Sequence, residues 1–208
     1  MQLLPGMQLI NGRVHIQSLL DLRLIRGRVQ MYAALFLTEW GSFFGGSQWM
    51  WGCFYYLRDQ YFIDFPDGGL MHNKEYDSGQ MHDRPCFYAF RDNSSRLFWF
   101  IPISSKVDKY HTIYDRISAR YGKCYTIVFG KVLGYEKAFL IQNMCPVSEK
   151  YIDKLYLDSL SHYPVRIDNR LEKEIRKKAK TVLAMERHGT KLLFPDVFKI
   201  EKRLLEEE

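Results

Sequence analysis

Two hydroxyl groups and a lysine stand together where a predicted strand gives way to a predicted helix, in the segment Ile101-Pro102-Ile103-Ser104-Ser105-Lys106. The first N–H groups of a helix point out of its first turn and hold anions, and hydroxyl groups add further donors. A lysine brings a compact positive charge. The pattern is therefore compatible with a phosphate site at Ser104, Ser105 and Lys106. The same residues also fit a simple helix cap followed by a solvated lysine.

A second constellation, His82-Asp83-Arg84-Pro85, directly precedes a predicted hairpin. An arginine binds phosphate through two parallel hydrogen bonds, and a histidine exchanges protons near neutral pH. We expect Arg84 to bind phosphate and His82 to act as an acid or a base, although His82 also suits a surface loop. His111 lies about one helical turn beyond Lys106 and faces either the same pocket or solvent.

Aromatic and basic residues elsewhere in the chain are typical of a surface that binds single-stranded RNA, because bases stack on aromatic rings and phosphates pair with cations. The candidates are Tyr61, Lys109, Tyr110, Arg176 and Lys177. The alternatives are a place in the core for the tyrosines and a solvated helix face for Arg176 and Lys177.

The elements that must position these residues are predicted from hydrophobic spacing and turn residues. Strands are expected over 53–61, 86–90, 97–102, 125–133, 137–142 and 151–157, a polar loop over 65–85, and a helical turn over 146–149. Helices are expected from 107 to a stop at Gly122, from a cap at Asp168 or Asn169 to Gly189, and from about Pro195 onward. This order predicts an α+β fold, an antiparallel meander curled into a small barrel with flanking helices.

The chain divides into two parts by composition. Residues 1–50 contain no lysine and one tyrosine, Tyr32, whereas residues 51–208 contain every lysine. Three interpretations of the first part are a targeting segment, a helical appendage, and upstream sequence preceding a true start at Met50. We favour the third and expect the functional domain to be 51–208.

Composition narrows the classes of function. The 47% hydrophobic and 26% charged residues indicate a globular protein, and the net charge of +6 favours an anionic partner, nucleic acid before membrane. The four cysteines, at 53, 86, 124 and 145, form no local pair of zinc-ligand spacing. They indicate reduced thiols in a cytoplasmic protein, with no metal or cofactor. The motifs of nucleotide, dinucleotide, zinc-protease and α/β-hydrolase sites are absent.

Residues 52–208 resemble the toxins of type III toxin–antitoxin systems, the ToxN-like endoribonucleases, and most closely their CptN branch. Four segments carry the resemblance through their order and spacing: Gly52-Cys53-Phe54-Tyr55-Tyr56-Leu57, His82-Asp83-Arg84-Pro85, Phe100-Ile101-Pro102-Ile103-Ser104-Ser105-Lys106 and Leu140-Ile141-Gln142-Asn143-Met144-Cys145-Pro146-Val147. The family's fold is a compact twisted antiparallel sheet or SH3-like barrel, as in the MazF and CcdB toxins, with added helices.

The resemblance implies metal-independent cleavage of cellular or phage RNA, leaving a 2′,3′-cyclic phosphate. It also implies inhibition by an antitoxin RNA pseudoknot in a closed toxin–RNA assembly, with no membrane partner. Ser104, Ser105 and Lys106 match the family's Thr-Ser-Pro-Lys segment without its proline, Arg84 matches a basic site residue, and Tyr61 matches an aromatic hydroxyl. A non-catalytic module that binds RNA or protein on a CcdB-like barrel is the alternative.

Overall fold

The structure of the protein is a computed structural model that describes residues 7–10, 13–16, 50, 52–77 and 80–207. The chain forms two compact units, Met1–Met50 and Trp51–Glu208. In the first unit, strand β1 (Met7–Ile10) pairs antiparallel with β2 (Arg13–Ile16). Most of residues 1–49, including the part that allowed the interpretation as a helical appendage, lies outside the described residues. All further description concerns the second unit.

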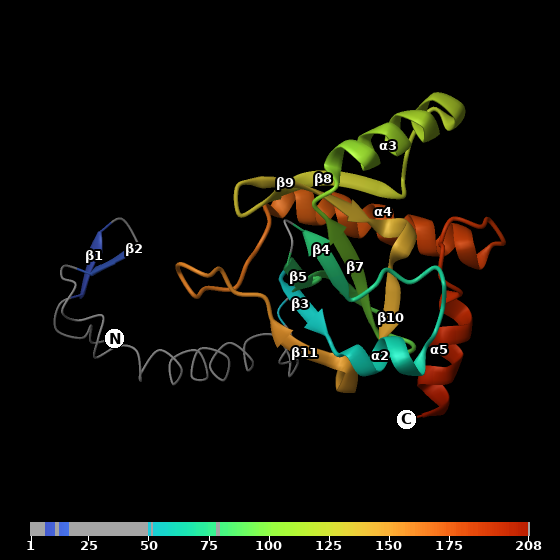
Figure 1. Ribbon diagram of the computed structural model, residues 1–208, viewed down its shortest axis with the longest axis horizontal. Helices are drawn as coiled ribbons and strands as arrows, with labels where there is room; N and C mark the ends of the chain where they lie inside the picture. The colour runs from blue at the N-terminus through green and yellow to red at the C-terminus, as the bar shows by residue number, and fades with distance from the viewer. Residues whose placement is uncertain (1–6, 11–12, 17–49, 51, 78–79, 208) are drawn as a thin grey trace. The chain divides into compact units, whose positions relative to one another are not determined.

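The second unit is built on an antiparallel sheet whose strands differ in length (Figure 1). Its strand order is β11 (Ile152–Leu155), β3 (Phe54–Leu57), β6 (Cys86–Arg91), β7 (Phe98–Ser104), β9 (Tyr135–Leu140) and β8 (Ile127–Val132). A short strand, β10 (Cys145–Val147), also pairs with β7. The antiparallel sheet and flanking helices are confirmed. Among the described strands, edges β11 and β8 do not pair with each other, so the sheet is open and the expected closure into a barrel is not found.

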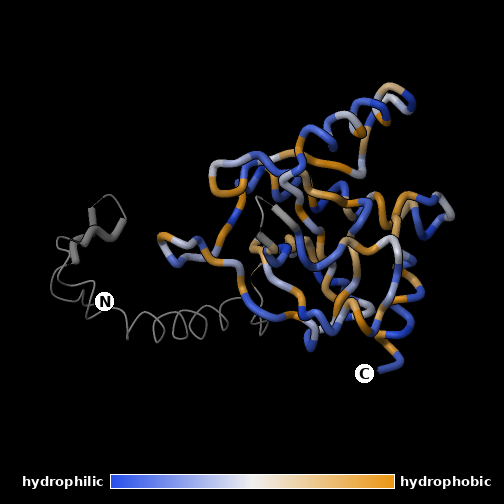
Figure 2. The backbone as a smooth tube through the Cα atoms, in the orientation of Figure 1, coloured by the Kyte–Doolittle hydropathy of each residue, from blue (hydrophilic) through white to orange (hydrophobic). Residues whose placement is uncertain are grey.

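Helices flank the sheet, and their limits follow local signals. Helix α4 (Asn169–Arg187) begins where the Asp168 side chain accepts hydrogen bonds from two backbone N–H groups. Helix α5 (Val197–Glu206) begins after Asp196, whose side chain accepts a hydrogen bond from the Lys199 N–H group. Helix α3 (Val107–Tyr121) ends at Gly122, whose φ of 78° is the left-handed conformation that glycine adopts freely. Helix α3 is drawn largely in hydrophilic colours in Figure 2, and Tyr110 is its one buried residue.

The core fixes strand β7, which carries the candidate site at its end. All seven residues of β7 are buried. Trp99 stacks on Phe90 of β6, and the fully buried rings of Phe54, Phe87 and Phe139 contact one another in the same core. Burying one such side chain contributes roughly 1.5–3 kcal/mol. Because this packing determines the position of β7, the residues that follow Ser104 start from a fixed point.

Three expectations about local structure are corrected. The first strand is shorter than predicted and is followed by α2 (Asp59–Asp64), so Tyr61 lies on a helix. The predicted polar loop contains a two-stranded hairpin, β4 (Lys74–Asp77) and β5 (Gln80–Asp83). Residues 145–147 form a strand paired with β7, and the helical turn comes afterwards as η2 (Glu149–Tyr151).

Gly69 fixes the position of the segment that leads into the β4–β5 hairpin. Its carbonyl accepts a hydrogen bond from Asn143 Nδ2 at 2.9 Å, and a Cβ atom there would overlap the backbone of Phe194 and Pro195. Gly69→Ala should therefore lower the free energy of unfolding by about 1–3 kcal/mol, the usual cost of overpacking. Chemical denaturation measures this loss. Gly68→Ala is the control, because its Cβ would meet no atom within 4 Å; equal stability of the two variants would contradict the role of Gly69.

Candidate functional site

The candidate site forms where β7 ends beside the start of β6. The two strands pair antiparallel with Cys86 opposite Pro102, and continuing this register by two residues brings Arg84 opposite Ser104. On its other side, Ser104 pairs with Ala138 of β9. The sheet thus brings the two constellations of the sequence, separated by twenty positions in the chain, to one place.

The start of α3 holds the residues that were predicted to bind an anion. The Ser104 Oγ atom accepts a hydrogen bond from the Lys106 backbone N–H at 3.2 Å, and the Ser105 carbonyl accepts one from Val107 N–H at 2.8 Å. No side chain caps the helix at Lys106. Lys106 is exposed and Ser105 is half-buried, whereas Ser104 is only 2% exposed. Hence Lys106 and Ser105 can meet a ligand directly, and Ser104 shapes the turn beneath them.

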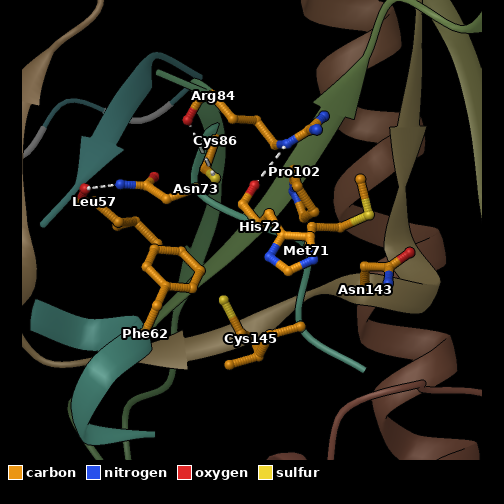
Figure 3. A pocket seen from close by; sticks show the side chains of 11 residues that line it. Leu57, Phe62, Met71, His72, Asn73, Arg84, Cys86, Pro102, Asn143 and Cys145 are labelled. Carbon is orange, nitrogen blue, oxygen red and sulfur yellow. Dashed lines mark hydrogen bonds between the residues drawn. The ribbon is translucent and has the colours of Figure 1, made fainter. Parts of the chain in front are cut away.

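Arg84 is buried and already bonded to protein. Its Nε donates to the His72 carbonyl at 3.1 Å, as Figure 3 shows, and Nη1 donates to the Ile103 carbonyl at 2.8 Å. Nη1 also lies 3.2 Å from Glu75 Oε2, in an ion pair whose side chains are 7% and 16% exposed. The expected two-bond clamp on phosphate would require these bonds to break. In this structure Arg84 instead ties the β4–β5 hairpin to the end of β7.

Sequence reasoning missed Glu75, because the polar segment around it was taken for a loop. The hairpin register sets Glu75 directly opposite His82, and continuing it sets Asn73 opposite Arg84, whose N–H donates to the Asn73 carbonyl. Side chains of directly opposed residues share one face of a sheet, as do alternate residues along a strand. Glu75, His82 and Arg84 therefore lie on one face of the hairpin. The alternation of charged residues around the turn is the only sequence signal of this arrangement.

Tyr110 reaches the same group of residues from α3. The side chain is 7% exposed. Burial raises the pKa of its hydroxyl, opposed by the nearby Arg84 charge and by a hydrogen bond with Ser104, while Glu75 raises it further. The hydroxyl is therefore protonated at neutral pH and faces Arg84, Ser104 and Glu75. Lys109 lies outside, with its ammonium 5.6 Å from the centre of the Tyr110 ring.

His111 is held on a different side of α3. Its ring stacks on Phe129 with centroids 3.8 Å apart, and its Nε2 lies 3.6 Å from Glu136 Oε2. Consecutive helix residues point about 100° apart, so His111 turns toward β8 and β9 while Tyr110 turns toward Arg84. Of the two histidines proposed from the sequence, His82 is the one on the face of Glu75 and Arg84.

Three further predicted RNA contacts lie outside this group. Tyr61 is fully buried, its hydroxyl donates to the Pro146 carbonyl at 2.8 Å, and burial raises its pKa well above the usual value. A side chain so enclosed cannot stack on a base, so Tyr61 is a core residue. Arg176 forms an ion pair with Glu172 on α4 at 3.4 Å, and Lys177 of the same helix is exposed.

A small cavity lies next to Arg84 (Figure 3). Its walls include Phe62, Met71 and two thiols, Cys86 and Cys145. Burial raises the pKa of the Cys145 thiol to about 12 and that of Cys86 further still. Because the thiolate is the reactive form, these thiols are inert at neutral pH. All four cysteines are free and buried, as expected.

The described residues contain neither a candidate metal cluster nor a candidate membrane span. No group of three or more histidine, cysteine, aspartate or glutamate side chains in that part of the chain is arranged to hold a metal ion. Within the same residues, no helix has both the length and the apolar character needed to cross a membrane.

Comparison with known proteins identifies a shared fold. No protein-family model and no curated protein matches the sequence. Among solved structures, the chain is similar to AbiQ, a lactococcal anti-phage endoribonuclease belonging to the type-III toxin–antitoxin system, with a TM-score of 0.51 and 17% identity. The match covers 74% of this chain and 94% of AbiQ. The resemblance inferred from the sequence is thus confirmed at the level of the fold.

Proposed function

We propose that this protein is the toxin of a type III toxin–antitoxin system, an endoribonuclease whose activity resides in residues 51–208. The observation that carries the proposal is the meeting of the Ser105–Lys106 helix start with the Glu75, His82 and Arg84 face at the end of β7. The likeness in fold to AbiQ, an endoribonuclease of such a system, supports it.

The proposed reaction is attack of a ribose 2′-oxygen on its own 3′-phosphate. The O2′–P bond forms and the P–O5′ bond breaks, which leaves a 2′,3′-cyclic phosphate and a 5′-hydroxyl end. Because RNA supplies the nucleophile, the protein must provide alignment, proton transfer and stabilisation of the extra negative charge. Nothing in this reaction calls for a metal ion or a cofactor.

Each site residue has a proposed role. Lys106 and the N–H groups that follow Val107 in the first turn of α3 stabilise the charge on the non-bridging phosphate oxygens, and Ser105 donates a further hydrogen bond. Ser104 holds the turn that presents them, through its bond with the Lys106 N–H. Arg84 contributes positive charge from behind the site while holding the hairpin, and His82 transfers a proton.

The proposed partner is an antitoxin RNA that folds as a pseudoknot and closes a toxin–RNA assembly, with cellular or phage RNA as substrate in the cytoplasm. The chain's charge of +6 suits such a polyanion. Lys109, beside Tyr110, and Lys177 on α4 are exposed cations available to RNA outside the site. A basic surface of this kind predicts binding that weakens as salt rises.

The test is incubation of purified protein with RNA in the presence of EDTA. We expect fragments of defined size, and we expect growth arrest when the protein is produced in cells without its antitoxin. RNA that is bound but left intact would contradict the nuclease and favour a non-catalytic RNA-binding module. RNA neither bound nor cut would contradict both.

A further inference from the structure

One face of the β4–β5 hairpin carries three side chains whose exposed fraction increases from the inner end to the outer end. Arg84 is 7% exposed at the inner end, the Glu75 side chain is 16% exposed, and His82 is exposed at the outer end. Glu75 and His82 are directly opposed across the two strands, which sets their Cβ atoms about 4.5–5.5 Å apart. The carboxylate and the imidazole are thus neighbours at the mouth of the site.

Among the described residues, Arg84 is the ion-pair partner of the Glu75 carboxylate. Arg84 Nη1 contacts its Oε2 atom at 3.2 Å, and this bond fixes the orientation of the carboxyl group. The groups that face it are Arg84 and His82 on the hairpin and Tyr110 on α3. The neighbouring Lys74 and Asp83 belong to the opposite face, and Lys74 pairs with Asp59 at 3.4 Å.

We infer that Glu75 and His82 are the proton-transfer pair of the site, with Arg84 as the residue that positions Glu75. This inference rests on the proposed ribonuclease function. Glu75 takes the proton of the 2′-hydroxyl as the O2′–P bond forms. Protonated His82 gives a proton to O5′ as the P–O5′ bond breaks. The two protons balance, and exchange with water restores both groups. A carboxylate and an imidazole side by side supply the acceptor and donor that this reaction requires.

A purely structural role for Glu75 would be to neutralise Arg84. Glu75→Gln separates the two roles, because the amide keeps an oxygen for the Arg84 guanidinium but cannot accept a proton. We expect Glu75→Gln to lower kcat by about 100-fold to 10,000-fold. RNA affinity and melting temperature should remain close to the wild-type values. Asp83→Asn is the control, since it neutralises a carboxylate on the other face of the same hairpin, on β5, and should leave kcat unchanged.

The pH profile of kcat/KM gives a second readout. The reaction needs one group deprotonated and the other protonated, so the wild-type rate should rise and then fall with pH. Glu75→Gln should lose the rise on the acid side, and His82→Ala should lose the fall on the basic side. A Glu75→Gln enzyme with wild-type rate and profile would overturn the inference, as would a loss of activity matched by loss of folding.

Assays of the wild-type protein beside the Glu75→Gln variant distinguish a wrong assignment of Glu75 from a wrong proposed function. Cleavage by the wild type with an active Glu75→Gln variant contradicts only the assignment of Glu75. Absence of cleavage by the wild type contradicts the proposed function, and the proton-transfer pair with it.

Discussion

Replacing Lys106 by alanine should lower RNA cleavage by at least about 100-fold, the usual effect of removing one group that stabilises a developing charge. Growth arrest by the protein should disappear with it. Lys106 is exposed and stands at the start of α3, where no side chain caps the helix, and its ammonium is the group that we propose to contact the phosphate. Its removal deletes positive charge from the site without disturbing the core, so the melting temperature should not change.

Lys199→Ala is the matched control for Lys106. It also removes an exposed lysine from the first turn of a helix, here α5, and it lowers the net charge equally. Initial rates on one RNA substrate and a thermal melt of each variant make the comparison. Equal rates for the two variants would show that Lys106 contributes only general charge and would contradict its place in the site.

Replacing Arg84 by alanine should affect both stability and activity. Its removal leaves the His72 carbonyl and the buried Ile103 carbonyl without this donor and Glu75 without its ion-pair partner. Breaking one partner of a buried pair costs about 3–5 kcal/mol. For a domain of this size, each kcal/mol shifts the melting temperature by about 2–4 °C. We therefore expect a large fall in melting temperature, together with loss of cleavage because the hairpin no longer holds Glu75.

Arg84→Lys tests the geometry of this link. Lysine keeps the positive charge but lacks the fork that reaches several acceptors at once, so it should recover only part of the stability. Urea denaturation of the wild type and both variants measures the difference. Wild-type stability in Arg84→Ala would contradict the assignment of Arg84 as the tie between the hairpin and β7.

Local signals made much of the fold predictable. Helix α4 has a capping aspartate at Asp168 and apolar residues at helical spacing, and its core residues Ile175, Ala179, Val182 and Leu183 are buried. The β6–β7 hairpin and the stop of α3 at Gly122 were predicted for the same reason. In each case the residues that determine the structure are close together in the sequence.

The remaining structure depends on contacts between distant segments. The β4–β5 hairpin is polar, so its sequence has no hydrophobic alternation, and its position depends on the bonds of Arg84 to His72 and Ile103. Strand β10 contains a proline and forms against β7 from a distance of more than forty residues. Neither feature has a local signal.

The site residues, too, could be predicted only where local sequence signals identify them. Ser104, Ser105 and Lys106 were found because they are consecutive at a strand–helix junction, and Arg84 because it precedes a hairpin. Tyr61 was misplaced because an aromatic residue near the first strand gives no sign of the helix that turns it into the core. Glu75 was missed because its relation to His82 and Arg84 exists only in the folded hairpin.

The most direct test of the central claim is the chemistry of the cut. Purified protein is incubated in EDTA with an RNA oligonucleotide that contains a mapped cleavage position, and with the same oligonucleotide carrying a 2′-deoxyribose there. The account predicts that the RNA yields a fragment ending in a 2′,3′-cyclic phosphate, identified by its mass, and that the deoxy-substituted RNA remains intact. Cleavage of the deoxy-substituted RNA, or a fragment ending in a 3′-hydroxyl, would contradict it.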